Sequence, residues 1–428
     1  MRWLLGAMLA VAVLSVSARA DEADAVKRIE KLGGTITRDE KQPGKPVIEV
    51  NLNKTEVTDA DLKALKEFKQ LTALYLSKTK VADAGLKELK ELKQLTTLHL
   101  DETQVTDAGL RELKDLQQLK ELILVGTQVT NAGLKELIPL QRLNTLYLGV
   151  TEVTDAGLKE FKELDQLATL DLCHTKVTDA GLKELKELKQ LKYLFLHQTD
   201  VTGVGLKELK ELKQLKYVSL FETQLTDAGL KELMELKQVT KQNTTLDLHA
   251  THVTDAGLKE LKELQQLTGL HLGGTKVTDA GLKELKELKR LTTVNLSRTK
   301  VTDDGLKELK ELKQLTGLNL SHTLVTDAGL KDLKELKQLT KLDLSGSQFD
   351  RNPFGGGRAP VTDAGLKDLK ELRQLTTLYL NDTEVTDAGL KELKELKQLT
   401  TLELGNTQAT DAGVKDLQDA LPKCRISR

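Results

Sequence analysis

The chain has 428 residues, of which 30% are charged and 39% are hydrophobic but only 3% are aromatic. Lys and Arg number 64 against 65 Asp and Glu, so the formal net charge is −1. This balance argues against a nucleic-acid-binding protein, which usually carries a basic excess or a basic face. Regular recurrence of Leu and a total of 6 Pro argue against a long disordered chain. Because enzymes of this length usually draw on aromatic side chains for core and pocket, the composition also disfavours an enzyme.

Residues 1–20 form the first distinct segment and predict a secretory signal peptide. A basic start at Arg2 is followed by an uncharged run to Ala18, and Ala18-Arg19-Ala20 has small residues where signal peptidase cleaves. The uncharged run is shorter than the roughly 20 residues needed to span a bilayer, which disfavours the alternative of an uncleaved membrane anchor. No second apolar run follows. We therefore expect a secreted or periplasmic protein with no stable membrane insertion after cleavage.

A repeat with the pattern V-T-D-A-G-L-K-E-L-K-E-L-K-Q-L-T-T-L-x-L-x-x-T occupies most of the remaining chain. It recurs fifteen times with a period of 24 residues, from Val57 to Ala409. The period is broken twice, by four extra residues at 239–242 and by twelve at 349–360. A repeat of this length cannot bury its own hydrophobic face, so the copies must stack into a solenoid.

Each repeat predicts one short strand followed by one helix. Leu98 and Leu100 alternate with polar residues, as in a strand with one buried face, and later Leu residues recur at helical spacing. Thr106 is the expected N-cap, and the following Asp suits the positive end of the helix dipole. Thr103 and its equivalents are expected to bond backbone in the turn after each strand and to form a ladder between copies.

This pattern resembles the leucine-rich-repeat family over roughly residues 46–428. The T-D-A-G-L segment is similar to the cysteine-containing subtype and to repeat proteins of planctomycete-like bacteria, although Thr occupies the position of the Cys. The resemblance implies an α/β, right-handed leucine-rich-repeat solenoid (horseshoe). It would have a parallel concave sheet of about sixteen strands and helices on the convex face. The lack of an F-box-like segment and the export signal leave ubiquitin-ligase function unsupported, and the fold alone does not specify a function.

The two ends of the array are expected to be caps. Residues 21–46 predict a helix and a hairpin strand that cover the first edge of the sheet, and residues 421–428 predict a capping strand. Between them, residues 47–420 form the repeat array with its two insertions. The longer insertion contains three Gly and two Pro, which predicts a loop. Its anchor-type residues suggest a secondary binding loop, with an inert insertion as the alternative: Phe349, Arg351, Phe354 and Arg358.

Few residues suggest a disulfide, a metal site or a catalytic site. Cys173 and Cys424 lie ten strands apart, which at ~4.8 Å per strand is about 50 Å, so no disulfide between them is expected. Cys173 with His174 and His197 suggests a metal site or a reactive thiol, but no third ligand or oxyanion pocket accompanies them. No catalytic or phosphate-binding motif is found. We expect no catalytic residues, no metal and no cofactor. The repeated Lys and Glu, such as Lys87 and Glu91, predict a self-neutralising, solvated convex face.

The aromatic residues occupy the positions of the strands that point to the concave side. All five Tyr lie there, as do six of the seven His. Because the core is built from Leu, these aromatics are not required for packing, although filling the curved face remains an alternative. The predicted binding strip is Tyr147, Tyr193, Phe195, His197, Tyr217 and Phe221.

The resulting hypothesis is an exported, non-enzymatic scaffold that binds a protein or peptide through this strip. Two alternatives remain open. The chain could be a cell-surface carbohydrate-binding protein that uses the ring faces as sugar platforms, or a structural spacer without a specific ligand.

Overall fold

A computed structural model of the chain describes residues 21–346 and 361–428. The predicted signal peptide, residues 1–20, and the predicted loop, residues 349–360, lie outside the described residues. The chain divides into two compact units. The first comprises the chain up to Asp200 together with Glu208–Val218, and the second comprises Val201–Lys207 together with Ser219–Arg428. In the part of the chain that the structure describes, no helix has both the length and the apolar character to cross a lipid bilayer.

The first unit is built on a sheet of nine strands in chain order. These are β1 (Thr35–Arg38), β2 (Val47–Asn51), β3 (Ala73–Tyr75), β4 (Thr97–His99), β5 (Glu121–Ile123), β6 (Thr145–Tyr147), β7 (Thr169–Asp171), β8 (Tyr193–Phe195) and β9 (Tyr217–Ser219). Residues 21–31 are helical, and β1 then pairs antiparallel with β2 at the first edge of the sheet. From β2 to β8 the strands pair in parallel with a register of one repeat, for example Leu98 with Leu122.

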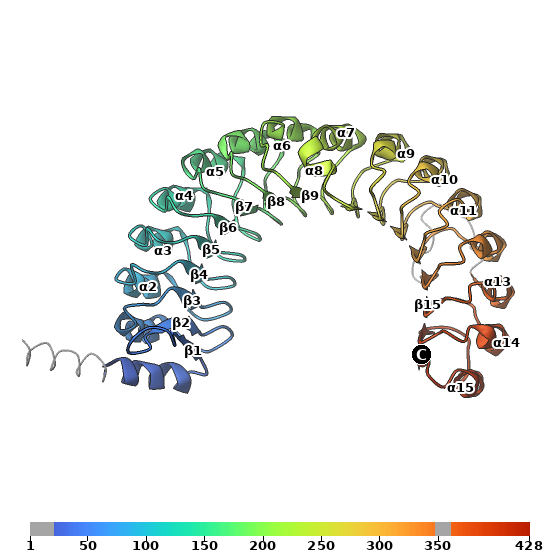
Figure 1. The fold of residues 1–428 in the computed structure, drawn as a ribbon, viewed down its shortest axis with the longest axis horizontal. Helices are drawn as coiled ribbons and strands as arrows, with labels where there is room; N and C mark the ends of the chain where they lie inside the picture. Colours follow the sequence, from blue (N-terminus) through green and yellow to red (C-terminus); the bar gives the residue numbers. More distant parts are fainter. Residues whose placement is uncertain (1–20, 347–360) are drawn as a thin grey trace, which may run out of the picture. The chain divides into compact units, whose positions relative to one another are not determined.

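Short helical segments follow strands β2 to β8. Most begin as one α-helical turn and continue as a 3₁₀ helix, labelled η: η1 (Asp59–Glu67), α2 (Asp83–Leu86), η2 (Lys87–Leu89), α3 (Asp107–Glu112), α4 (Asn131–Leu134), η3 (Lys135–Leu137), α5 (Asp155–Leu158), η4 (Lys159–Glu163), α6 (Asp179–Leu182), η5 (Lys183–Glu187) and η6 (Val204–Leu209). Within each unit, Figure 1 shows the strands on the inner side and the helices on the outer side.

The second unit repeats this arrangement with an eight-stranded parallel sheet. Its strands are β10 (Thr245–Asp247), β11 (Gly269–His271), β12 (Thr293–Asn295), β13 (Gly317–Asn319), β14 (Lys341–Asp343), β15 (Thr377–Tyr379), β16 (Thr401–Glu403) and β17 (Arg425–Ser427). Its helices are α7 (Asp227–Glu235), α8 (Lys237–Thr240), α9 (Asp255–Leu258), η7 (Lys259–Glu263), α10 (Asp279–Leu282), η8 (Lys283–Glu287), α11 (Asp303–Leu309), α12 (Asp327–Leu330), η9 (Lys331–Glu335), α13 (Asp363–Leu369), α14 (Asp387–Glu392), η10 (Leu393–Glu395) and α15 (Asp411–Ala420). The sixteen repeat strands β2 to β17 therefore belong to two sheets rather than to one.

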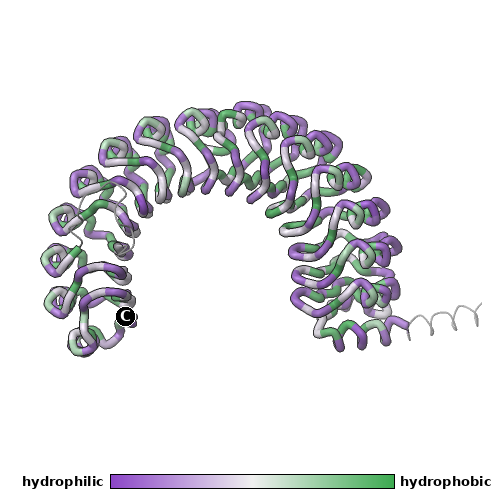
Figure 2. The backbone as a smooth tube through the Cα atoms, turned by 180° about the vertical axis from the view of Figure 1, so that it is seen from behind, coloured by the Kyte–Doolittle hydropathy of each residue, from purple (hydrophilic) through white to green (hydrophobic). Residues whose placement is uncertain are grey.

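The core lies between the strands and the helices and consists almost wholly of Leu and Val. In one repeat, Leu98, Leu100, Val105, Leu110 and Leu113 are all 0% exposed. Full burial of a Leu side chain stabilises a fold by roughly 1.5–3 kcal/mol, so the repeated Leu positions supply the main stabilisation. Figure 2 shows these hydrophobic stretches recurring in every coil of both units, with hydrophilic stretches on the outer side.

The T-D-A-G segment joins each repeat to the next. Asp155 accepts two hydrogen bonds from the next repeat's Thr178, from the backbone N–H to Oδ1 at 2.8 Å and from the hydroxyl to Oδ2 at 2.6 Å. Thr178 Oγ1 in turn accepts the N–H of Ala180, as expected for an N-cap. A Cβ on Gly181 would lie 2.4 Å from Asp155 Oδ1. The Gly is therefore required because the carboxylate of the preceding repeat occupies that space.

The expected bond from Thr103 to backbone in its turn is confirmed, but the expected ladder is formed by other residues. The Thr103 hydroxyl donates to Leu100 O at 2.5 Å, so this buried Thr closes its own turn and forms no ladder. A ladder between repeats is formed instead by other threonines. The hydroxyl of Thr292 donates to Thr268 O at 3.0 Å, and that of Thr316 donates to Thr292 O at 3.1 Å.

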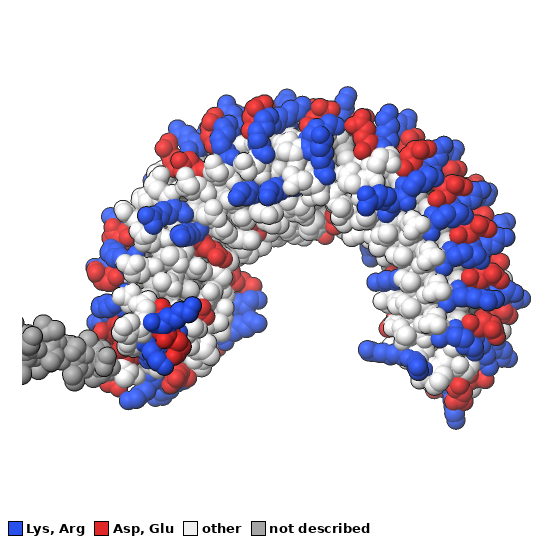
Figure 3. Space-filling view, in the orientation of Figure 1, with Lys and Arg blue, Asp and Glu red and all other residues white. Residues whose placement is uncertain are grey.

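Lys87 and Glu91 do not share one helix, because η2 ends at Leu89 and Glu91 lies beyond it. Ion pairs on the outer side instead connect neighbouring repeats, such as Lys313 with Glu335 at 3.3 Å. Both side chains of that pair are about half exposed, so the pair contributes little to stability. Figure 3 shows Lys and Arg interspersed with Asp and Glu over the outer side.

The four extra residues at 239–242 coincide with an additional helix. The short helix α8 directly follows α7, and Val239 and Thr240 are buried at 2% and 6% exposure. The extra residues thus add packed structure on the helical side of the second unit, immediately before its sheet begins at β10.

The twelve-residue insertion leaves the repeat geometry on either side unchanged. Strands β14 and β15 pair Leu342 with Leu378, in the register of the other repeats, and Asp327 accepts hydrogen bonds from Thr362 N and Oγ1 at 2.8 and 2.6 Å. We therefore expect deletion of residues 349–360, which restores the 24-residue period, to change the melting temperature by no more than a few degrees. Thermal unfolding followed by circular dichroism measures this. Loss of cooperative unfolding in the deletion variant would contradict it.

Candidate functional site

Three of the predicted strip residues form a row of aromatic rings on the inner face of the first unit. Tyr147 on β6 and Phe195 on β8 have ring centroids 6.4 Å apart at 26°, and Phe195 and Tyr217 on β9 have centroids 5.7 Å apart at 54°. Tyr193 occupies the outward-facing position next to them on β8 and is 41% exposed. The row and Tyr193 together are called the ring row below. It offers a rigid apolar surface in the middle of the inner face.

The other predicted strip residues have different places. His197 follows β8 and is half-buried, and its carbonyl accepts the N–H of His174 at 3.0 Å. Phe221 follows β9, belongs to the second unit and is also half-buried. The residues of the predicted secondary loop lie outside the described residues: Phe349, Arg351, Phe354 and Arg358.

Two residues near the ring row did not figure in the sequence prediction. Asp171 lies on β7 between Tyr147 and Phe195 and is only 7% exposed. Burial, followed by the charges of Asp171 and Glu121, raises the pKa of the Tyr147 hydroxyl. Val150, in the turn after β6, is 47% exposed at a φ of 56°, a left-handed conformation that is strained for a β-branched residue. The sequence does contain a signal for both residues, because an acid and an apolar residue lie next to the predicted aromatic strip.

A depression of about 630 Å³ lies along the turns beside Val150. It is lined by Thr127, Gln128, Val150, Thr151, Glu152, His174, Thr175, Lys176, Gln198 and Asp200. These residues are polar apart from Val150. The depression therefore extends the inner face with hydrogen-bonding groups, as the rim of a binding surface does.

A second cluster of rings and acids lies nearer the start of the same sheet. The rings of Tyr75 and His99 meet edge to face with centroids 4.7 Å apart, and His99 Nε2 lies 3.1 Å from Glu121 Oε1. Burial, followed by the charges of Glu49 and Glu121, raises the pKa of Tyr75. Strands β2 to β9 contain the acids Glu49, Glu121 and Asp171 and no Lys or Arg. The strands of the first unit therefore carry aromatic and acidic side chains, whereas Lys120, Lys192 and Lys216 directly precede β5, β8 and β9.

In the second unit, the last residues of β10 and β11 form an acid–histidine pair, Asp247 with His271. Asp247 Oδ2 lies 3.6 Å from His271 Nδ1, and the hydrogen bond to Asp247 raises the pKa of His271. Burial works against ionisation of Asp247, but its bonds to His271 and to the N–H of His249 lower its pKa overall. Among the described residues, no group of three or more His, Cys, Asp or Glu is arranged to hold a metal ion.

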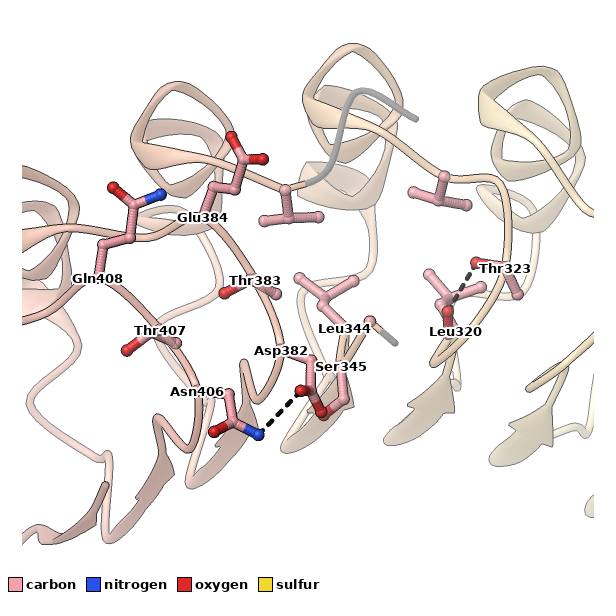
Figure 4. A pocket seen from close by; sticks show the side chains of 13 residues that line it. Leu320, Thr323, Leu344, Ser345, Asp382, Thr383, Glu384, Asn406, Thr407 and Gln408 are labelled. Carbon is pink, nitrogen blue, oxygen red and sulfur yellow. Dashed lines mark hydrogen bonds between the residues drawn. The ribbon is translucent and has the colours of Figure 1, made fainter. Parts of the chain in front are cut away.

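A cavity of about 340 Å³ also lies in the second unit (Figure 4). Leu344 and Thr383 line it, and Asn406 donates a hydrogen bond to Asp382 at 3.0 Å across its mouth. We assign no ligand to this cavity, because the segment that begins after Gly346 and ends before Val361 lies outside the described residues.

Both cysteines are free thiols, as their spacing predicted. The suggestion that Cys173 is reactive is not supported, because burial and the adjacent Asp171 carboxylate raise its pKa to about 12, and burial raises that of Cys424 to about 11. We therefore expect labelling by a disulfide reagent at pH 8 to be slow in the native protein and to reach two thiols per chain after unfolding without reductant. Fast labelling of one native thiol, or fewer than two thiols after unfolding, would contradict this.

Comparison with known proteins identifies the repeat. Residues 289–310 and 372–394 match the family model described as Leucine Rich repeat. Among solved structures, an internalin from Listeria monocytogenes aligns with a TM-score of 0.50 and 22% identity, covering 91% of each chain. A leucine-rich-repeat protein from Leptospira interrogans aligns with a TM-score of 0.58 and 25% identity, covering 85% of this chain and 92% of its own.

A third solved structure is the ectodomain of a plant membrane receptor kinase from Arabidopsis thaliana, in complex with CASPARIAN STRIP INTEGRITY FACTOR 2. It has a TM-score of 0.52 and 16% identity over 91% of this chain but only 51% of its own. No curated protein matches the chain in sequence. The predicted fold class, a leucine-rich-repeat solenoid with parallel strands and alternating helices, is thus confirmed.

Proposed function

We propose that the chain is an exported, non-enzymatic scaffold that binds a protein or peptide through the ring row on the inner face of its first unit. The observation that carries this proposal is the row in which Phe195 contacts both Tyr147 and Tyr217, with Tyr193 exposed on the same strand as Phe195. A core of Leu and Val needs none of these rings. In a chain with 3% aromatic residues, their gathering on one face favours recognition over packing.

Two further observations support binding on this side rather than on the helices. The outer side carries alternating charges that neutralise one another (Figure 3), and among the described helices only Val204, at 42% exposure, offers an exposed large apolar side chain. The receptor ectodomain from Arabidopsis has the same fold and was solved with a bound partner. The pattern of residues 1–20 supports export, so the partner would be met in the periplasm or outside the cell.

Selection from a random library of 12-residue peptides displayed on phage tests this proposal. The full mature chain is immobilised, and the bound peptides are then assayed against a variant with Tyr193, Phe195 and Tyr217 all replaced by Ala. The matched control replaces Lys159 and Lys183 by Ala, since both are exposed on the helical side of the same unit. We expect peptides that bind the parent and the control but not the ring variant.

A glycan array run with the same proteins distinguishes the alternatives. Binding of glycans through the rings, with no peptide selected, would identify a carbohydrate-binding protein instead. If neither probe binds, or if the ring variant binds as well as the parent, the proposed peptide site is wrong and the structural spacer becomes the better explanation.

A further inference from the structure

Asp171 is a buried acid on β7, the strand between those of Tyr147 and Phe195. Its strand pairs with β6 on one side and β8 on the other, so Asp171 is in register with both Tyr147 and Phe195. Those two rings stack toward each other across it, and the residue is only 7% exposed. One carboxylate oxygen accepts the backbone N–H of Cys173 at 2.8 Å.

That hydrogen bond does not require a charge. The equivalent position in other repeats holds Asn295 or Asn319, whose amide oxygens accept the N–H two residues later at 2.9 Å in both cases. An Asn at position 171 would therefore serve the backbone equally well. The negative charge of Asp171 needs a different explanation.

The charge of Asp171 also has no cation to balance it. The equivalent Asp247 in the second unit lies 3.6 Å from His271, whereas no Lys, Arg or His in the described part of the chain pairs with Asp171. The Cys173 thiol hydrogen-bonds the Asp171 carboxylate but brings no positive charge, because burial and that carboxylate raise its pKa to about 12 and it keeps its proton. A buried carboxylate without a counter-charge is costly, and a bound cation would offset that cost.

The surface above Asp171 is suited to such a cation. The faces of Tyr147 and Phe195 carry the negative side of the aromatic quadrupole, and the carboxylate of Asp171 on the strand between them adds to the same negative potential. Strands β2 to β9 themselves contain no Lys or Arg, and the nearest in sequence to the ring row are Lys192 and Lys216, which directly precede Tyr193 and Tyr217.

From this geometry we infer that the partner of the ring row is a peptide segment carrying a Lys or Arg side chain. Its ammonium or guanidinium group lies on the rings of Tyr147 and Phe195, held by the carboxylate of Asp171. This inference rests on the proposed function and adds the chemical class of the ligand to it.

The test uses the 12-residue peptides selected on the parent chain. We expect Lys or Arg to be enriched at one position next to an apolar residue. Replacing that Arg by the neutral isostere citrulline, or that Lys by acetyl-lysine, should weaken binding to the parent about tenfold or more. The same replacement should weaken binding to the Asp171→Asn variant less than twofold, because the charge that the cation recognises is already absent.

Asp343→Asn is the matched control, since Asp343 accepts the N–H of Ser345 at 3.0 Å in the same way but lies in the second unit. It should bind like the parent, and Asp171→Asn should melt no lower than the parent. Peptides that require the rings but contain no basic residue and bind Asp171→Asn as tightly as the parent would overturn this inference alone. Peptides that ignore the rings, or a failure to select any, would overturn the proposed function and this inference together.

Discussion

Replacing Asp155 by Ala should destabilise the first unit by about 2–3 kcal/mol, although Asp155 is not part of the core. The substitution removes the acceptor of two hydrogen bonds that Thr178 donates, one from its backbone N–H at 2.8 Å and one from its hydroxyl at 2.6 Å. Hydrogen bonds to a charged group contribute about 1.5–3 kcal/mol each when buried, and this pair is only partly buried. The expected readouts are a lower urea midpoint and faster hydrogen exchange at the Thr178 amide.

Asp155→Asn provides the matched control, because the preceding repeat has Asn131 at the equivalent position. Asn131 accepts the N–H of Thr154 at 2.9 Å and donates its amide to the Thr154 hydroxyl at 2.9 Å. We expect Asp155→Asn to lower the free energy of unfolding by less than half as much as Asp155→Ala does. Equal losses in the two variants would show that the hydrogen bonds do not hold the repeats together.

Replacing Tyr193 and Tyr217 together by Ala should weaken peptide binding at least thirtyfold and leave stability nearly unchanged. Truncation of an aromatic anchor at the centre of an interface typically costs about 2 kcal/mol or more, which corresponds to about thirtyfold in Kd. Tyr193 is 41% exposed, and both side chains extend from the sheet on the side opposite the Leu core, so no core cavity is opened. Isothermal titration calorimetry and thermal unfolding measure the two effects.

The Lys159→Ala, Lys183→Ala variant serves again as the control on the helical side of the same unit. It should bind the peptide like the parent. A double tyrosine variant that melts many degrees lower would assign the rings to packing instead. Unchanged affinity in a folded double variant would exclude the ring row as the site.

The features that repeat within one 24-residue unit could be predicted from the sequence. The strand at Leu98 and Leu100, the buried Leu stripe and the Thr106 N-cap all follow from local spacing and propensity, and all are present. Stacking of the copies follows because a single unit cannot bury its own apolar face.

The features that depend on contacts between units or copies were not predicted. The Asp of T-D-A-G was interpreted as a partner of the helix dipole, whereas Asp155 bonds Thr178 of the next repeat. Its position is what excludes a side chain at Gly181. The division of the strands into two sheets after β9 has no counterpart in the alternation of Leu, which continues through it.

The candidate site shows the same limit. The sequence places Tyr147 and Phe195 on the inner face, but their contact across β7 depends on both rings leaning over Asp171. Phe221 fits the same sequence pattern and yet belongs to the second unit. The face on which each ring lies could therefore be predicted from the sequence, whereas the contacts between the rings could not.

Fluorine NMR of protein labelled with 3-fluorotyrosine tests the central claim most directly, because the chain contains only five tyrosines and all lie on inner faces. Tyr→Phe variants assign the five resonances. On titration with a selected peptide, we predict shifts or broadening for Tyr147, Tyr193 and Tyr217 and an unchanged resonance for Tyr379 in the second unit. A bound peptide that leaves the first three resonances unchanged, or that perturbs Tyr379 alone, would contradict the assignment of binding to the ring row.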